Sequence, residues 1–300
     1  MDKIISVDIV IPCYNVENII EKCVRSLSSQ AYPKNRYHCY FINDASTDRT
    51  PEILDNFNNV DNITVIHHKK NLGLSSTRNT GINKCNADFI AFLDGDMVVE
   101  SNWLESFFPY FKKNIIAVMG DNVPPDDIIL NPVEKYYFGN LRGARQFNDG
   151  ENISFQYMLY GNAMVRRSGL INSGLFDAKI NKYGGEDTDL SAKIWNKYPH
   201  CFIYSKKSNS VHYHRRTLKE FCLSMKIYGE NNLPVLIKRY PEHKNKLSAD
   251  WIYSIKGHLL FNPILSGLIN MIYFIFPLQV LIRYMVVNAV ITGARNSEKY

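Results

Sequence analysis

Residues 89–96 read Phe-Ile-Ala-Phe-Leu-Asp-Gly-Asp. The apolar part of this stretch suits a buried strand, and it stops at two carboxylates, Asp94 and Asp96, with a glycine between them. In an open α/β sheet, ligands bind outside the carboxyl ends of the strands. Carboxylate oxygens at that edge suit a hard divalent cation, which can in turn hold a diphosphate. A polar turn would explain one aspartate after the strand, but it explains the pair less well.

Strand and helix signals alternate through the first half of the chain. The pattern predicts strands at residues 7–11, 37–42, 63–66 and 88–93, and helices at residues 19–27, 50–57 and 75–84. Farther on it predicts strands at residues 115–119 and 201–204 and a helix at residues 187–195. We therefore expect an α/β, Rossmann-like single domain with a mostly parallel mixed central sheet flanked by helices. A C-terminal helical appendage follows this domain.

Composition excludes a disordered or fibrous protein, because 45% of the 300 residues are hydrophobic and 21% are charged. The six cysteines are scattered and form no Cys-x-x-Cys pair. Since the sequence shows no secretory leader, we expect reduced, mostly buried thiols in a cytoplasmic protein.

Positive charge is concentrated in one segment. Residues 206–256 contain 11 Lys or Arg and 4 Asp or Glu, a net charge of +7, whereas the whole chain carries +6. Such a segment attracts the phosphates of nucleotides or lipid headgroups, although a solvated basic surface is an equal alternative. No nucleic-acid-binding motif accompanies it, so we expect no nucleic acid partner.

The C-terminal region is apolar. Residues 264–282 contain no charged side chain, but Asn270, Pro277 and Gln279 interrupt the run. We expect one or two helices that lie on the cytoplasmic face of a membrane or pack in the protein, rather than a true span. Hydrophobic packing and a homodimer are the alternatives.

Polar side chains also follow the first two predicted strands. Pro12, Tyr14 and Asn15 end the first strand, where an aromatic face and an amide can contact a base or ribose. Asp44 ends the second strand, where its carboxylate can accept a hydrogen bond from a base or ribose. Asp48 is predicted only to cap the following helix.

Three further motifs contain candidate site residues. In residues 71–81, Gly73 permits a tight turn, and Arg78 can reach a phosphate or brace the aspartates. In residues 184–190, glycines lead into a helix whose first turn carries three carboxylates, among them Asp187, a candidate general base. His212 and His214 alternate on an extended stretch, so at most one of them turns toward the carboxylates as a metal ligand.

In this order, the motifs resemble those of the inverting glycosyltransferases of family 2, which have the GT-A fold. The likeness covers about residues 5–232 and rests on residues 9–15, 43–48, 71–81, 92–96 and 184–187. Asn43 stands where the family often has Asp, and Thr77 where it usually has Ala. The Gln-x-x-Arg-Trp motif of the processive synthases is absent, which favours transfer of a single sugar or a short series.

The resemblance implies a role for each matching residue. The nucleotide pocket would be lined by Pro12, Tyr14, Asn15 and Asp44, with Gly73 and Arg78 in the same donor site. Asp94 and Asp96 would serve the ribose, the metal and the diphosphate, and Asp187 would be the catalytic base. Candidate ligands of the metal, Mn²⁺ or Mg²⁺, are Asp96, Asp94, His214 and His212.

The expected activity is metal-dependent, inverting transfer of one sugar from a nucleotide-sugar, with UDP-sugars favoured, to a hydroxyl acceptor. The acceptor would belong to cell-surface glycan or lipid-linked oligosaccharide synthesis. We expect the catalytic domain at residues 1–235, with donor binding in about 1–120 and acceptor binding in 121–235, and the helical region at 236–300. One alternative is a non-catalytic, membrane-associated nucleotide-sugar-binding module. A sugar-nucleotide pyrophosphorylase is less favoured, because the glycine-rich loop of those enzymes is missing after the first strand.

Overall fold

A computed structural model describes residues 5–140, 142–213 and 215–297. The described residues fall into two compact units. The first unit lies within Met1–Asp127, Ala144–Asn181 and Leu190–His214, and the second within Ile128–Gly143, Lys182–Asp189 and Arg215–Tyr300. The functional boundaries that we predict near residues 120 and 235 concern donor and acceptor binding, and they stay predictions.

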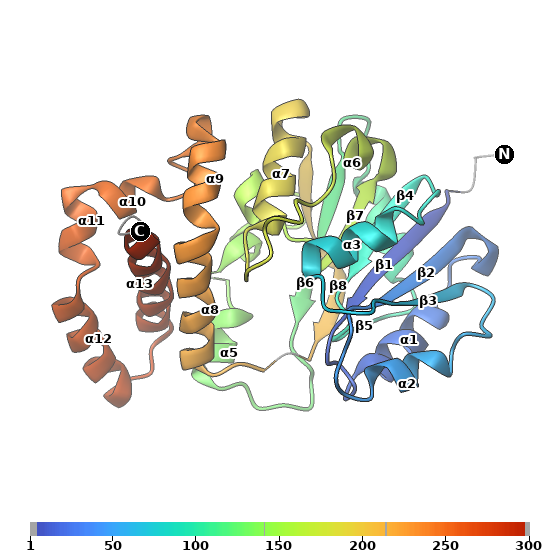
Figure 1. Ribbon diagram of the computed structural model, residues 1–300, viewed down its shortest axis with the longest axis horizontal. Coiled ribbons are helices and arrows are strands. Elements are labelled where there is room, and N and C mark those ends of the chain that lie inside the picture. Colours follow the sequence, from blue (N-terminus) through green and yellow to red (C-terminus); the bar gives the residue numbers. More distant parts are fainter. Residues whose placement is uncertain (1–4, 141, 214, 298–300) are drawn as a thin grey trace. The chain divides into compact units, whose positions relative to one another are not determined.

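The first unit is built on one eight-stranded mixed sheet (Figure 1). The strand order is β3-β2-β1-β4-β7-β6-β8-β5. The strands are β1 (Val7–Cys13), β2 (Tyr37–Asn43), β3 (Ile63–His67), β4 (Phe89–Leu93), β5 (Met97–Val99), β6 (Ala117–Val123), β7 (Asn162–Arg166) and β8 (Phe202–His212). Because β1 runs parallel to β2 and to β4, their carboxyl ends lie at the same edge of the sheet.

Helices cover both faces of this sheet (Figure 1). Apolar residues alternate along the strands, so that Ile9 and Phe41 pack with α1 and α2 in one core. Val10 and Ile42 face α3 on the opposite side, where a Cβ on Gly81 would come within 2.5 Å of Val10. Glycine at residue 81 therefore lets α3 lie close to the sheet. The helices of this unit are α1 (Ile20–Ser28), α2 (Thr50–Asp55), α3 (Leu74–Ile82), α4 (Trp103–Phe107) and α6 (Arg167–Ser173).

The structure confirms the predicted fold class, and the predicted strands and helices of the first half are all present. Two strands were not predicted, β5 and β7, which are short and have no clear alternation. The last strand is also longer than expected, since β8 runs to His212. Three aromatic side chains from the middle of the chain are buried, namely Tyr136, Phe155 and Tyr160.

The second unit is helical. Its helices are α5 (Pro132–Tyr137), α8 (Leu218–Asn231), α9 (Leu233–Arg239), α10 (Ala249–Tyr253), α11 (Ile255–Leu260), α12 (Pro263–Ile275) and α13 (Gln279–Ser297). Helix α7 (Glu186–Lys197) begins in the second unit and continues along the chain into the first. Short 3₁₀ helices occur in both units. They are η1 (Lys34–Arg36), η2 (Phe108–Tyr110), η3 (Gly143–Gln146), η4 (Phe155–Tyr157) and η5 (Pro241–His243).

The core of the second unit lies where α8 meets α13. Phe221, Ile282 and Met285 are buried there. The backbones approach closely, because a Cβ on Gly229 of α8 would come within 2.1 Å of the Val290 carbonyl oxygen of α13. Among the described residues, no helix combines the length and the apolar composition that crossing a membrane would require.

All six cysteines are free, and five of them are buried, as the sequence predicts for reduced structural thiols. Cys222, on α8, is the one that is partly exposed.

Asn162, at the start of β7, joins three segments of the first unit. Its side-chain amide nitrogen donates to the carbonyl oxygens of Asp121 at 2.8 Å and Ser208 at 2.9 Å. Its side-chain oxygen accepts a 3.0 Å hydrogen bond from the indole nitrogen of Trp103. Since Asn162 and Trp103 are both buried, water cannot replace these bonds.

We expect Asn162→Leu to lower the free energy of unfolding by about 3 kcal/mol, because it leaves buried polar groups without partners. Urea denaturation followed by tryptophan fluorescence measures this change. Asn172→Leu, at an exposed position on α6, is the control. Equal stability of the Asn162 variant and the wild type would show that these bonds contribute little.

Candidate functional site

The site begins at the carboxyl end of β4. All five residues of β4 are buried, and Asp94 and Asp96 lie in the turn that leads into β5. The backbone N–H of Asp94 donates to the carbonyl oxygen of Gly161 at 2.9 Å. A Cβ on Gly95 would come within 3.0 Å of the Pro12 carbonyl oxygen, so glycine lets this turn lie against the end of β1.

Arg78 braces Asp94. Its guanidinium donates to Asp94 Oδ1 at 3.1 Å and lies 5.2 Å from the centroid of the Phe176 ring. Arg78 is 1% exposed, so it is not the surface arginine that the sequence left open as an alternative. The side chain of Asp94 remains 32% exposed. The ion pair thus orients Asp94 at the edge of the sheet while leaving part of its carboxylate open to a ligand.

His212 lies beside Asp96. Its Nε2 is 3.2 Å from Asp96 Oδ2, and the pairing of Met97 with His212 in strands β5 and β8 sets this approach. The backbone N–H of Tyr213 also donates to the carbonyl oxygen of Asp96 at 3.0 Å. The structure therefore brings one of the two predicted histidines to the carboxylates. His214 lies outside the described residues.

The pKa of the Cys13 thiol reflects the negative charge of this edge. Burial raises its pKa well above the ordinary value, and the carboxylates of Asp94 and Asp96 raise it further. Cys13 therefore stays protonated and apolar beneath the aspartates.

The loops after β1 and β2 are tied together. The side-chain oxygen of Asn15 accepts a 2.8 Å hydrogen bond from the backbone N–H of Thr47, and its own N–H donates to Ser46 Oγ at 3.0 Å. Asn15 has a φ of +52°, which asparagine tolerates better than most residues. Beside this clamp, Tyr14 is 50% exposed and its ring is open to a planar ligand.

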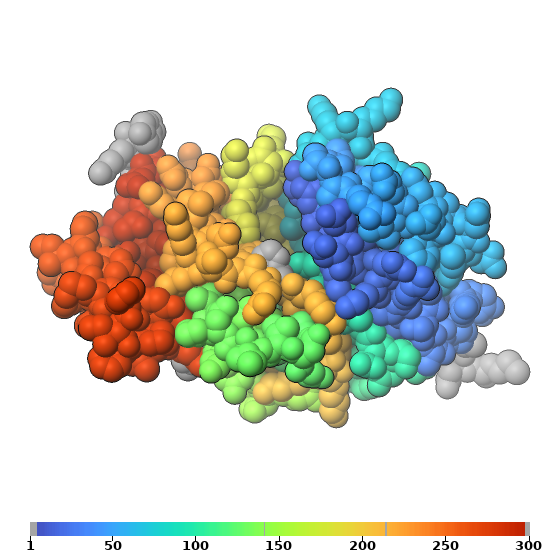
Figure 2. All heavy atoms as spheres, turned by 90° about the horizontal axis from the view of Figure 1, so that it is seen from below, coloured from blue at the N-terminus to red at the C-terminus, as the bar shows by residue number. Residues whose placement is uncertain are grey.

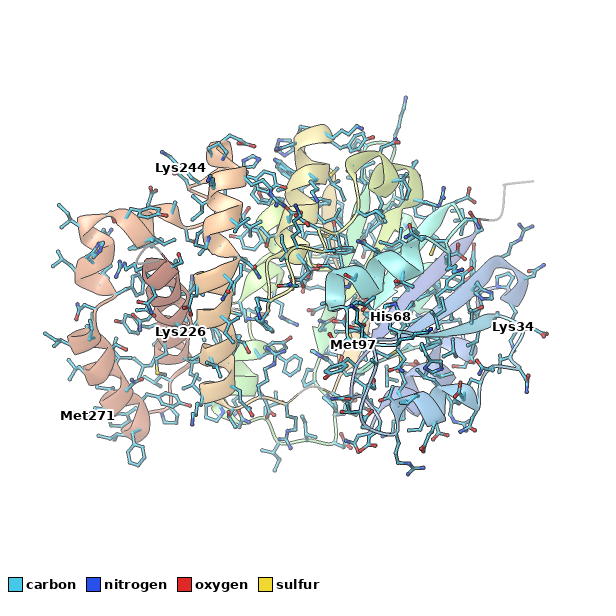
Figure 3. All side chains as sticks on the ribbon, in the orientation of Figure 1. Lys34, His68, Met97, Lys226, Lys244 and Met271 are labelled. Atoms are coloured by element: carbon cyan, nitrogen blue, oxygen red, sulfur yellow. The ribbon has the colours of Figure 1, made fainter. Side chains whose placement is uncertain are left out.

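Asp44 organises the loop before α3. Its Oδ1 accepts hydrogen bonds from His68 Nδ1 at 2.7 Å and from the backbone N–H of Leu72 at 2.9 Å. Its Oδ2 accepts from the N–H of Gly73 at 2.9 Å, and Gly73 has a φ of +84°. The buried carboxylate thus holds the glycine turn in place and contacts His68, which Figure 3 labels.

Asp48 lies one residue before Arg49, the N-cap of α2, and contacts the start of this helix without being its N-cap. Its carboxylate accepts from the backbone N–H groups of Glu17 and Thr50, each at 3.0 Å. Partial burial acts to raise the pKa of Asp48, but the hydrogen bonds from Thr50 and Glu17 outweigh it and lower that pKa.

In the second unit, Asp187 lies in the first turn of α7. Gly184 and Gly185 precede this helix with φ values of +77° and +95°. Asn232, at the end of α8, holds their loop by donating to the Gly184 carbonyl oxygen at 2.6 Å. Positive φ at both glycines explains why the sequence needs this pair before the helix.

The three carboxylates of that first turn differ in burial. Asp189 is fully buried and pairs with Arg239 at 2.5 Å and with the Tyr240 hydroxyl at 2.8 Å. Glu186 is 8% exposed, whereas Asp187 is partly exposed. Asp187 is therefore the carboxylate of this turn that is open to a substrate.

Gly161 is a site residue that the sequence analysis missed. A Cβ there would come within 2.6 Å of Asp94 Oδ2, so a larger residue would displace the carboxylate. The sequence did not identify Gly161 because β7, which begins at the next residue, was not predicted.

Two carboxylates and an imidazole lie at one edge of the sheet, and these are side chains that can coordinate a divalent cation. Within the described part of the chain, however, no group of three or more His, Cys, Asp or Glu side chains is arranged to hold a metal. Asp96 and His212 are already adjacent, while Asp94 is turned toward Arg78. A divalent cation beside Asp96 and His212 would therefore need further ligands, such as the oxygens of a bound diphosphate.

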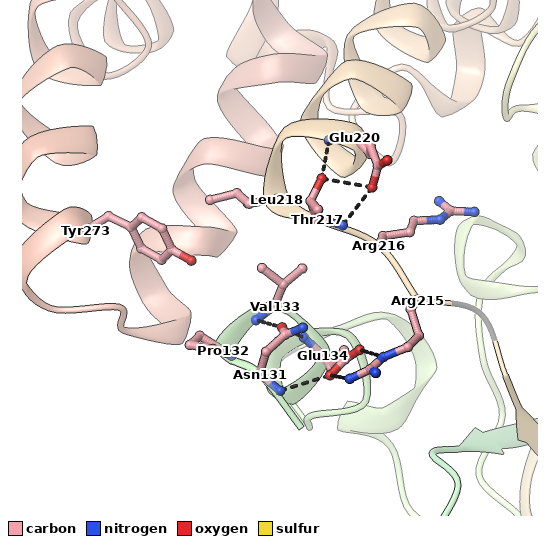
Figure 4. Close-up of a pocket in the computed structure, with 10 residues that line it drawn as sticks. All are labelled: Asn131, Pro132, Val133, Glu134, Arg215, Arg216, Thr217, Leu218, Glu220 and Tyr273. Carbon is pink, nitrogen blue, oxygen red and sulfur yellow. Dashed lines mark hydrogen bonds and ion pairs between the residues drawn. The ribbon is translucent and has the colours of Figure 1, made fainter. Parts of the chain in front are cut away.

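Two cavities have linings that do not include these residues. One, of about 680 Å³, is lined by residues at the amino ends of β1 and β2, such as Asp8 and Tyr37, which is the wrong edge for a ligand of a parallel sheet. The other, of about 450 Å³, belongs to the second unit and is lined in part by Glu134, Arg215 and Tyr273 (Figure 4). Arg215 Nε donates to Glu134 Oε1 at 2.8 Å.

The chain matches the family model described as Glycosyl transferase family 2 over residues 8–174, more than half of its length. It therefore belongs to that family. The matched residues include β1 to β4 and the Asp94–Asp96 turn.

Curated relatives agree with this assignment. The chain is 29% identical over 200 residues to glycosyltransferase GlyA of Streptococcus pneumoniae, which covers 63% of this chain and 28% of that protein. It is 34% identical over 151 residues to glycosyltransferase AglE of Haloferax volcanii, which covers 50% of this chain and 46% of that protein. The chain thus spans less than half the length of either relative.

Solved structures agree on the fold, which is GT-A. A mannosyltransferase from Pyrobaculum calidifontis, PcManGT, in complex with GDP-Man and Mn²⁺, superposes with a TM-score of 0.68 at 15% identity, covering 100% of this chain and 88% of that one. Residues 1–349 of S. aureus TarS, in complex with UDP, superpose with a TM-score of 0.56 at 16% identity, covering 98% and 91%.

The Glu134–Arg215 pair gives a pH-dependent prediction. The hydrogen bond from Arg215 holds the pKa of Glu134 below its ordinary value, against the opposing effect of partial burial. A depressed carboxyl pKa adds stability above the unfolded-state pKa, and this stability is lost as the pH falls through the folded-state value. Wild type should therefore melt above Glu134→Gln at pH 7, and the difference should shrink as the pH falls through the folded-state pKa of Glu134.

Thermal melts followed by circular dichroism at pH 7 and at a series of lower pH values measure this difference. Glutamine keeps the acceptor for the Asn131 N–H, so the comparison isolates the charge. Asp126→Asn, at an exposed carboxylate, is the control. A difference that persists at low pH would mean that the ion pair is not its source.

Proposed function

We propose that this chain catalyses inverting transfer of one sugar from a nucleotide-sugar to a hydroxyl acceptor. The observation that carries the proposal is the Asp94-Gly95-Asp96 turn at the carboxyl edge of the sheet, held by Arg78 and adjacent to His212. Membership of glycosyl transferase family 2 supports the same class of reaction.

The donor half of the proposed site is in the first unit. The exposed ring of Tyr14 would stack on the base, and Asn15 would contribute its amide face beside it. Asp44 would act mainly by holding the turn at Gly73, since its carboxylate already accepts three hydrogen bonds. Asp94, oriented by Arg78, would accept from the ribose hydroxyls.

Asp96 and His212, with Asp94, would hold Mn²⁺ or Mg²⁺. Such an ion, when bound, neutralises negative charge on a nucleoside diphosphate leaving group. Mn²⁺ accompanies GDP-Man in the PcManGT complex, which supports a divalent metal here.

Asp187 would be the general base. It would accept the proton of the acceptor hydroxyl while that oxygen attacks the anomeric carbon, and the bond from this carbon to the diphosphate oxygen would break. A single displacement of this kind inverts the anomeric centre. We further propose that UDP-sugars are preferred and that the acceptor belongs to a cell-surface glycan or a lipid-linked oligosaccharide.

Asp187→Asn should leave donor binding unchanged and lower kcat by about 10²- to 10⁴-fold, because the amide cannot accept the proton. Thermal shift with Mn²⁺ and a panel of UDP-, GDP- and dTDP-sugars first identifies the donor, which we expect to be a UDP-sugar. Calorimetry and turnover with that donor then compare the variants. Asp61→Asn, at an exposed carboxylate, is the control, and a near-normal kcat for Asp187→Asn would eliminate Asp187 as the base.

Asp96→Asn tests the metal. Asparagine keeps a hydrogen-bonding group beside His212 but loses the charge that a divalent cation requires. We expect Mn²⁺ to strengthen UDP binding to the wild type but not to this variant, as measured by calorimetry with and without Mn²⁺. Equal stimulation in both proteins would contradict the assignment of Asp96 as a ligand.

A further inference from the structure

Helix α12 has an apolar face that nothing in its own unit covers. Along one side, Ile269 and Tyr273 pack against the core that α8 and α13 form. On the other, Ile264, Leu268 and Met271 are 87%, 50% and 67% exposed, and they recur at helical spacing. An outward face of a helix in water is ordinarily polar. Figure 2 shows the orange atoms of this helix at the surface of the second unit, and Figure 3 labels Met271 on it.

The apolar surface extends beyond α12 in both directions along the chain. Exposed neighbours lie on α11, at the end of α12, between α12 and α13, and at the start of α13, namely Ile255, Leu259, Phe274, Ile275, Phe276, Leu278 and Val280. Phe274 is 91% exposed. Single exposed apolar side chains are normal, but a contiguous set of this size marks an interaction surface. We call it the α11–α12 face.

Positive charge predominates in the segment that carries the α11–α12 face. Residues 250–297 contain Lys256, Arg283 and Arg295 against one acidic residue, the exposed Asp250. Lys256 and Arg283 are exposed. Arg295 has a structural role instead, since it donates to the carbonyl oxygens of residues 251, 252 and 261. The exposed charges of this segment are therefore complementary to an anionic partner.

The side chains beside the α11–α12 face are those that favour a membrane–water interface. Trp251 is 37% exposed and Tyr253 51% exposed. The Lys256 ammonium lies 5.4 Å from the centroid of the Trp251 ring. Tryptophan and tyrosine are enriched at the headgroup level, and lysine can keep its charge in water while its stem lies on apolar surface.

A second copy of this chain fits less well. In a two-fold dimer the same patch meets itself, so Lys256 and Arg283 of the two copies would approach one another, with Asp250 as the one exposed carboxylate of residues 250–297 to pair with them. An anionic lipid surface avoids this repulsion, because it attracts the same cations. The 13 residues of α12 are also too few to cross a bilayer, which needs about 20.

We propose that the α11–α12 face docks this chain on the surface of an anionic lipid bilayer, with α12 lying in the interface. Met271 and Phe274 would enter the acyl region, while Lys256 and Arg283 would contact headgroup phosphates. Docking of this kind is independent of the sugar that the chain transfers.

Cosedimentation of the full chain with vesicles tests this. We expect binding to vesicles of phosphatidylcholine with phosphatidylglycerol, and weaker binding to phosphatidylcholine alone. Met271→Glu combined with Phe274→Glu should reduce the partition coefficient by at least about 10-fold, because two buried apolar side chains are lost from the acyl region. Both positions are exposed, so the fold should survive, and circular dichroism checks this.

Ile129→Glu is the matched control, since Ile129 is an apolar residue of the second unit that is 93% exposed and lies outside the α11–α12 face. It should bind vesicles like the wild type. Failure of the wild type to bind either vesicle would overturn the proposal, and so would equal binding by the double variant. A dimer that the double variant disrupts, without vesicle binding by the wild type, would assign the face to a second copy instead.

Discussion

A buried guanidinium needs a counter-charge, and at the carboxyl edge of this sheet Arg78 finds it in Asp94. The pair links α3 to the turn after β4, so it joins the helix that follows the Gly73 loop to the strand that ends in the two aspartates. Gly161 and Gly95 leave room for that turn. The position of Asp96 beside His212, and with it the proposed metal site, follows from the same turn.

Much of the first unit could be predicted because its elements are local and periodic. The strands at residues 7–11 and 88–93 read as apolar runs that end in polar motifs, and parallel strands bring such motifs to one edge. Strand β5 escaped prediction because it has only three residues. Strand β7 escaped because its apolar part is only residues 163–165, between Asn162 and Arg166. Because β7 was not predicted, the sequence also did not show that Gly161 lies at the site or that Asn162 joins three segments.

The sequence predicts which residues form the candidate site, but it does not predict the contacts that these residues make. The sequence does not tell whether the Arg78 side chain is exposed or packs against Phe176. Its burial depends on tertiary packing that no local pattern encodes. The same holds for the choice among the three carboxylates at the start of α7. Asp189 is buried by Arg239 and Tyr240, some fifty residues later, and that long-range contact is what leaves Asp187 as the open one.

In the proposed donor site, Arg78 would act on the nucleotide-sugar through Asp94. A double-mutant cycle with Arg78→Met, Asp94→Asn and the double variant, read as the affinity for UDP in the presence of Mn²⁺, tests it most directly. If the two residues act as one unit, the loss in the double variant should be smaller than the sum of the single losses, with a coupling of about 1–3 kcal/mol. Strictly additive losses, each as large in the presence of the other substitution as alone, would contradict the account.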